Sequence, residues 1–120
     1  MSNSQSVTAE VLQSLAEASI TSSFQPVGVG FTAPVRIMTL VNNTDGDMIF
    51  SLDGVNNNFF VPKNSFRLYD FCTNRQNVDQ IFALPTGAQI YVKYSSMPST
   101  GAVYVEGIYG IRLYTVPGGM

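Results

Sequence analysis

The chain has 120 residues, of which 6 are Lys or Arg and 8 are Asp or Glu, so its formal net charge is -2. This length suits a single domain with its own core, and the charge balance provides no basic surface for nucleic acid or an anionic membrane. Charged residues make up 12% of the chain, about half the usual share for a soluble domain. Such a surface favours contact with other proteins.

The N-terminal third predicts a helix followed by an arm. "TAEVLQSLAEASI" places Val11, Leu12 and Leu15 at helical spacing after a suitable N-cap residue, which predicts a short amphipathic helix over residues 8–19. The next stretch, "TSSFQPVGVGFTAP", contains two prolines and two glycines, which favour an extended connector. Residues 1–34 are therefore expected to form a helix and an extended arm.

Residues 35–110 have the pattern of a β-domain. Short segments rich in β-branched and aromatic residues alternate with turn signals: "VRIMTLVN", "DMIFSL", "NFFVP", "SFRLYDF", "QIFAL", "AQIYVKYS" and "AVYVEGIYG". This spacing predicts an all-β fold of about seven strands, either an antiparallel β-sandwich or a small barrel. The residues expected to point inward are Ile37, Phe50, Leu68, Ile90, Val92 and Val103. Residues 111–120 are expected to be a C-terminal tail.

The acidic stretch 42–62 raises the possibility of a metal site. A helix-loop-helix calcium loop has a glycine at its sixth position and oxygen ligands at its first and twelfth positions. If Gly46 is the sixth residue, Val41 and Leu52 occupy those two ligand positions. "TDGD" and "LDGV" are therefore predicted to be Asp-Gly turns in which glycine accepts a positive φ, and no metal is expected.

The sequence offers little catalytic chemistry. It has no histidine, which is the commonest general base at neutral pH and the usual partner of a serine or cysteine nucleophile. Cys72 is the only cysteine and lies among aromatic residues, so a buried thiol is expected. Asp70 interrupts a strand, and capping of the next turn or pairing with Arg67 or Arg75 explains it more simply than catalysis. No catalytic residue, metal ligand or cofactor is predicted.

Three stretches resemble a family of small structural proteins of tailed bacteriophages. They are "LVNNTDGDMIFSLDGVNNNFFVPKNSFRLYDFCTNR", "LPTGAQIYVKY" and "TGAVYVEGIYG", and the resemblance covers about residues 24–110. It implies an all-β virion component that is built in many copies into the head, the neck or the tail. No functional residue is carried over, because the shared positions are apolar strand residues and turn glycines.

The expected function is therefore that of a non-enzymatic virion protein at the head-to-tail junction or tail, or of a cement protein on the capsid shell. Its expected partners are copies of itself and other virion structural proteins, without nucleic acid, membrane or a small-molecule substrate. The expected location is the virion, assembled in the host cytoplasm, because "MSNSQSVTAEVLQSL" has no secretory pattern. The candidate interface residues are Val11, Leu12, Leu15, Phe24, Phe31, Leu113 and Tyr114.

The alternative function is a carbohydrate-binding β-sandwich for host recognition. It would use polar and aromatic residues in loops such as 53–58 and 73–79. The chain contains no tryptophan, the preferred residue for stacking on sugars, and this weakens the alternative.

Overall fold

The computed structural model describes residues 3–71 and 83–114, with residues 3–6 and 111–114 described through their backbone. A single turn of 3₁₀ helix, Glu17–Ser19, is the only helical element in these ranges. The strands are β1 (Asn3–Ala9), β2 (Gln13–Ala16), β3 (Gln25–Pro26), β4 (Ile37–Thr44), β5 (Met48–Ser51), β6 (Phe59–Val61), β7 (Ser65–Asp70), β8 (Tyr91–Tyr94) and β9 (Gly101–Tyr114).

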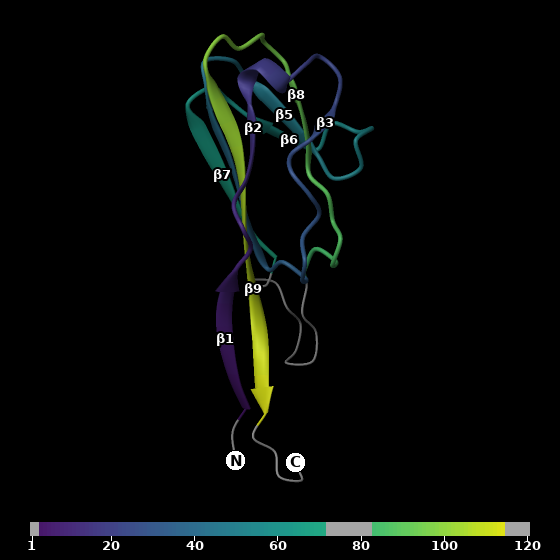
Figure 1. The fold of residues 1–120 in the computed structure, drawn as a ribbon, viewed down its shortest axis with the longest axis vertical. Helices are drawn as coiled ribbons and strands as arrows, with labels where there is room; N and C mark the ends of the chain where they lie inside the picture. Colours follow the sequence, from purple (N-terminus) through teal and green to yellow (C-terminus); the bar gives the residue numbers. More distant parts are fainter. Residues whose placement is uncertain (1–2, 72–82, 115–120) are drawn as a thin grey trace.

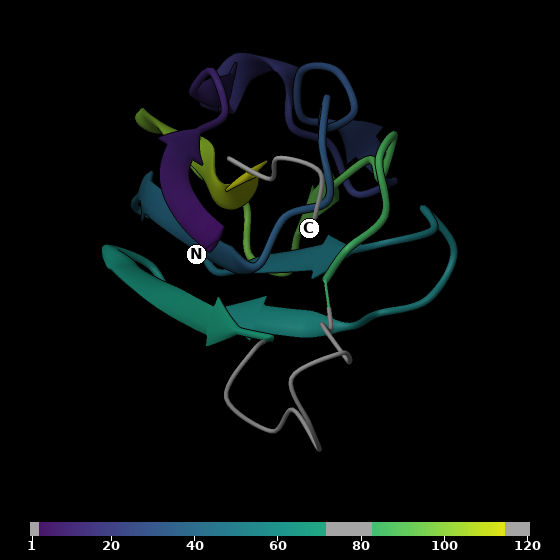
Figure 2. The same ribbon diagram turned by 90° about the horizontal axis from the view of Figure 1, so that it is seen from below.

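The strands form two antiparallel sheets that pack as a sandwich (Figure 1). The five-stranded sheet has the order β1-β9-β4-β7, and β2 also pairs with β9. The four-stranded sheet has the order β3-β8-β5-β6. In Figure 2, which views the molecule from below, the purple β1 and the teal-green β7 lie on either side of the blue β4, in keeping with their places at the two ends of the strand order. The all-β prediction is confirmed, and of the two architectures that the sequence left open the structure has the sandwich.

Six of the seven predicted strand segments correspond to β4–β9. The remaining segment, "QIFAL", lies partly outside the described residues, and its Leu84 forms an isolated bridge with Val35. The described residues contain nine strands because β1, β2 and β3 join the sheets from the segment that was expected to be a helix and an arm.

The core between the sheets is apolar and almost fully enclosed. Phe50, Ile90, Val92 and Val103 are each at most 2% exposed, as the sequence predicted. Phe50 is the largest of the fully buried side chains. The close packing of these side chains is the main source of stability for a domain of this size.

Two predicted core positions are wrong. Leu68 is 57% exposed, and Ile37 is only partly buried, because the inward face of β4 carries Met38, Leu40 and Asn42 instead. Val35 is buried like Met38 and Leu40, so strict alternation along "VRIMTLVN" breaks at Arg36. The N–H of Arg36 donates to the carbonyl of Ile108, and its own carbonyl accepts from the N–H of Phe71. A strand shifted by one residue presents its other face to the core.

The predicted helix over residues 8–19 is also wrong. β1 and β2 lie along β9, with Thr8 opposite Tyr109 and Leu15 opposite Val103. Between these strands the N–H of Glu10 donates to the carbonyl of Gly107 over 2.8 Å. The long edge of β9 satisfies the backbone of this segment, and such tertiary pairing overrides a weak helix propensity.

β1 and the last part of β9 form a two-stranded ribbon that extends beyond the sandwich (Figure 1). Asn3 pairs with Tyr114, so both described ends of the chain meet at the tip of this ribbon. Residues 3–6, from the segment expected to be a helix and an arm, therefore pair with residues 111–114, from the segment expected to be a tail, within one chain.

Polar side chains fasten the N-terminal segment to the loop that precedes β4. The carboxylate of Glu10 accepts hydrogen bonds from the N–H groups of Thr32 and Ala33 and from the Thr32 hydroxyl, at 3.0–3.1 Å. Oε1 of Gln13 accepts from the N–H of Val29 at 3.3 Å. These contacts fix the path of the chain between β1 and β2 and thereby shape the neighbouring surface of β9.

Within the described ranges, no helix is both long and apolar enough to cross a membrane. Cys72 and Arg75, singled out from the sequence, lie outside the described residues, as does the loop 73–79.

Candidate protein interaction surface

The side of the five-stranded sheet that faces away from the core forms a continuous, partly apolar surface. Direct strand pairing aligns its side chains in three rows across β7, β4 and β9. Cross-strand partners lie on the same face of a sheet, so the rows can be read from the register. We define this outer face by its rows, which are Phe66–Val41–Tyr104, Leu68–Thr39–Glu106 and Asp70–Ile37–Ile108.

The outer face is accessible although six of its nine residues are apolar or aromatic. Phe66 is 61% exposed and Leu68 57% exposed on β7, and across the sheet Leu12, in the segment between β1 and β2 beside β9, is 53% exposed. Monomeric soluble proteins rarely expose contiguous apolar patches of this kind. Glu106 and Asp70 stand within the rows, and Arg36 lines the third hollow together with Asp70, so this surface carries charges of both signs.

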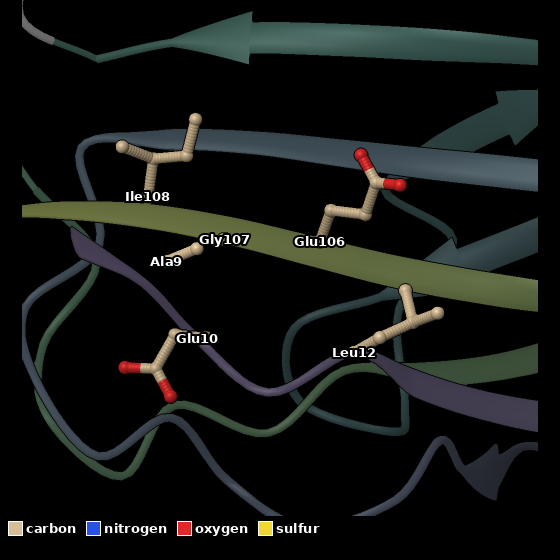
Figure 3. Close-up of a pocket in the computed structure, with 6 residues that line it drawn as sticks. All are labelled: Ala9, Glu10, Leu12, Glu106, Gly107 and Ile108. Carbon is tan, nitrogen blue, oxygen red and sulfur yellow. The ribbon is translucent and has the colours of Figure 1, made fainter. Parts of the chain in front are cut away.

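Three shallow hollows lie along the outer face, and each is lined by members of its rows. The first has a volume of about 280 Å³ and is lined by Ala9, Glu10, Leu12, Glu106, Gly107 and Ile108 (Figure 3). Glu106 and Ile108 rise from β9 in the same direction, whereas Glu10 points away from them.

The second hollow, of about 210 Å³, includes Val41, Phe66 and Tyr104. The third, of about 190 Å³, includes Ile37 and Asp70. Open hollows along a sheet face suit the side chains of a docked protein better than an enclosed small molecule.

The structure brings together only part of the predicted interface set. Val11 and Leu12 are exposed beside β9, at 78% and 53%, which leaves them available to a partner. Leu15 packs against the core, and Phe31 belongs to the core at 4% exposure. Phe24 is half-buried and directly precedes β3 of the four-stranded sheet.

The ring of Phe24 lies 4.6 Å from the Nζ of Lys93, so it already has a partner within the chain. The backbones of Leu113 and Tyr114 pair with Ser4 and Asn3, and their side chains lie outside the described part.

The acidic stretch forms turns in which the carboxylates bind backbone N–H groups. Asp47 accepts from the N–H of Lys63 at 3.0 Å, and Asp53 accepts from Val55 and Asn56 at 2.9 and 2.8 Å. Gly54 has a φ of +75°, as predicted for a turn. The prediction of positive φ is wrong for Gly46, where glycine is needed because a Cβ would lie 2.3 Å from the Ser96 carbonyl.

Among the described residues, no group of three or more His, Cys, Asp or Glu side chains is arranged to hold a metal ion. The loop 53–58, considered for sugar binding, uses its polar groups internally. Oδ1 of Asp53 also accepts from the Ser51 hydroxyl at 2.8 Å, and its Oδ2 accepts from the Asn56 amide at 2.6 Å. These hydrogen bonds lower the pKa of Asp53, the largest contribution coming from the Asn56 N–H. A sugar would have to compete with them.

Asp45 provides a test of the turn at the end of β4. Its carboxylate accepts hydrogen bonds from the Ser99 hydroxyl, from the Ser99 N–H at 2.7 Å and from the Thr100 N–H at 3.2 Å. These bonds, the Ser99 hydroxyl first among them, lower the pKa of Asp45 from 3.8 to about 2. A depressed pKa stabilises the fold above the unfolded value, and this contribution is lost as the pH falls through the folded value.

We therefore expect part of the stability to disappear as the pH falls from 3.8 to about 2. Thermal unfolding measured across this range should show a smaller loss for Asp45→Asn than for the natural chain. Ser99→Ala, which keeps the charge but removes the hydroxyl donor, should move the acid transition to higher pH. Identical acid transitions for all three proteins would contradict this account of Asp45.

The residues of the outer face that sequence reasoning missed are Phe66, Val41, Tyr104 and Ile108. Phe66 and Leu68 alternate with Arg67 and Tyr69, so neither side of β7 reads as clearly polar. The position of Asp70 on the same face as Leu68 was the available signal that this side points outward.

Comparison of the chain with protein-family models, with curated proteins and with solved structures found no match.

Proposed function

We propose that this chain is a non-enzymatic structural protein of a tailed bacteriophage virion. It assembles in many copies at the head-to-tail junction or tail, or on the capsid shell as a cement protein. The observation that carries the proposal is the outer face, an accessible sheet surface with six apolar or aromatic side chains and three hollows along it. Its assignment to a phage particle comes from the resemblance of the sequence over residues 24–110.

The chemistry of the described residues supports an assembly role over an enzymatic one. The chain has no histidine, and the carboxylates of Asp45, Asp47 and Asp53 accept hydrogen bonds from nearby backbone N–H groups. Such groups hold turns in place, and their pKa values, where shifted, move away from the neutral range that acid–base catalysis requires. The outer face, by contrast, has the mixed apolar and charged character of a protein contact surface.

The proposal is tested by purifying particles from lysed cells that carry the gene. Mass spectrometry of the gradient fractions should find the chain at a fixed ratio of several copies per particle. Recovery of the chain only at the top of the gradient, or with glycans rather than particles, would overturn the virion role.

The same experiment can test the outer face. Leu12→Lys places a charge beside the first hollow, at a residue that is already 53% exposed, and should reduce incorporation into particles. Met97→Lys is the matched control, because Met97 is 78% exposed in the loop between β8 and β9, outside the outer face. Equal incorporation of both variants would show that the surface near Leu12 is not a contact.

A further inference from the structure

We infer that two copies of this chain associate through their β7 strands, edge to edge and antiparallel, with Leu68 of one copy opposite Leu68 of the other. This pairing joins the two five-stranded sheets into one and makes their outer faces continuous. It deepens the proposed function, since it names the first contact in an assembly of many copies.

The first support is a comparison of β7 with the two edges of the four-stranded sheet. The four-stranded sheet ends in β3, which has two residues and includes Pro26, and in β6, which has three residues and is followed by Pro62. Short edge strands and proline are common protections against unwanted pairing. Both edges of this sheet are therefore blunted.

The edge formed by β7 lacks these protections. Its six residues, "SFRLYD", contain no proline, glycine or lysine. Among the described residues β7 pairs with β4 on one side only, as the last strand of its sheet. A long edge strand with exposed Phe66 and Leu68 is a ready template for another strand.

The second support is the order of side chains along β7, which favours a second copy as the partner. Antiparallel pairing centred on Leu68 brings Leu68 opposite its counterpart and Arg67 opposite Tyr69 of the other chain. Arg67 is exposed and Tyr69 is half-buried, so the guanidinium can reach an aromatic ring without unfolding either chain. A register centred on Arg67 would instead oppose two like charges.

The ring of Tyr69 is held in place for such a contact. It packs against Phe59 of β6 with a centroid distance of 4.7 Å and an interplanar angle of 47°. This contact links β7, an edge of the five-stranded sheet, to β6, an edge of the four-stranded sheet. A fixed ring and a fixed strand reduce the conformational entropy that pairing costs.

The contact is small, since it involves one strand of six residues from each copy. Interfaces of this size are weak in isolation, so we expect a dissociation constant on the order of micromolar. Within a particle, other contacts would raise the effective concentration of one copy near another.

Sedimentation of the full chain over a range of concentrations tests the inference. The natural protein should show a monomer–dimer equilibrium, and Leu68→Lys should weaken it about a hundredfold, because two like charges would then lie opposite each other. Val55→Lys is the control, since Val55 is 77% exposed in the loop between β5 and β6. Arg67→Glu provides a second edge variant, and it too should weaken the dimer.

Cross-linking tests the register directly. In a background with Cys72→Ser, Leu68→Cys should form a disulfide-linked dimer under mild oxidation, because a two-fold axis through this position places the residue beside itself. Val55→Cys should form several-fold less. Equal cross-linking at both positions, or equal sedimentation of the lysine variants, would overturn the inference, as would a natural protein that stays monomeric at millimolar concentration.

These outcomes are separable from the fate of the proposed function. A monomer in solution that is nevertheless incorporated into particles would refute β7 pairing and leave the virion role standing. A β7 dimer that is never found in particles would support β7 pairing and refute the virion role.

Discussion

Replacing Gly101 with alanine should lower the free energy of unfolding by about 3 kcal/mol or more. Gly101 begins β9, the strand that pairs with β1, β2 and β4. Its φ is +95°, and a Cβ at this position would lie 1.9 Å from the carbonyl oxygen of Asn43. Since that oxygen belongs to the backbone of β4, relief of the clash requires the two central strands to separate.

Gly87→Ala is the matched control for this prediction. Gly87 has a similar φ of +88°, but a Cβ there would have no neighbour within 4 Å. Its replacement should cost about 1 kcal/mol, the conformational part alone. Urea denaturation of both variants measures the difference. Equal losses of unfolding free energy in the two variants would show that β4 and β9 tolerate the added methyl group. Only the positive φ would then account for the destabilisation at Gly101.

Replacing Asn42 should have the next largest effect. This side chain is fully buried on the inner face of β4. Its amide nitrogen donates to the carbonyls of Gly46 and Val61 at 2.8 and 3.0 Å, and its oxygen accepts from the hydroxyl and N–H of Thr44 at 2.6 and 3.1 Å. The described part of the molecule has no buried side-chain polar atom without a partner, so this network is complete.

Asn42→Ala leaves several buried polar groups unsatisfied and should cost about 3 kcal/mol or more in unfolding free energy. Asn42→Asp, which keeps the shape but removes both donors, should cost at least as much at neutral pH because a carboxylate would face two carbonyl oxygens. Asn43→Ala, on the exposed side of the same strand, is the control and should change stability by less than about 0.5 kcal/mol. A neutral Asn42→Ala variant would show that water replaces the network.

The pairing of the two described chain ends bears on the assembly that we propose. An unattached arm would be free to reach a neighbour, whereas β1 already uses one of its edges on β9. The ribbon therefore offers a neighbour a preformed pair of strands. An isolated two-stranded ribbon is only marginally stable in water, so contact with other copies should stabilise it.

The sequence by itself determined the fold class and most of the strands. β-branched and aromatic runs between Asp-Gly and Asn-rich turns identified β4–β9, because these local preferences agree with the final pairing. The absence of histidine and the low charge are visible in the sequence alone. The expectation of protein contacts rather than catalysis depends on these two properties.

Only the tertiary structure decided the conformation of the N-terminal segment and which face of the five-stranded sheet points toward the core. "EVLQSL" suits a helix as an isolated peptide, but its last three residues belong to β2 and pair with β9, and the N–H of Glu10 also bonds to β9. The edge of β9 is present to satisfy this backbone, and the pairing overrides the helix propensity. The face of β4 was misread because Asn42 and Thr44 appear polar in sequence, although hydrogen bonds with Gly46 and Val61 allow their burial. Because these two polar side chains of β4 are hydrogen-bonded, they can face the core, and the alternate residues of the strand then face outward. Those outward residues belong to the outer face that we propose as the contact surface.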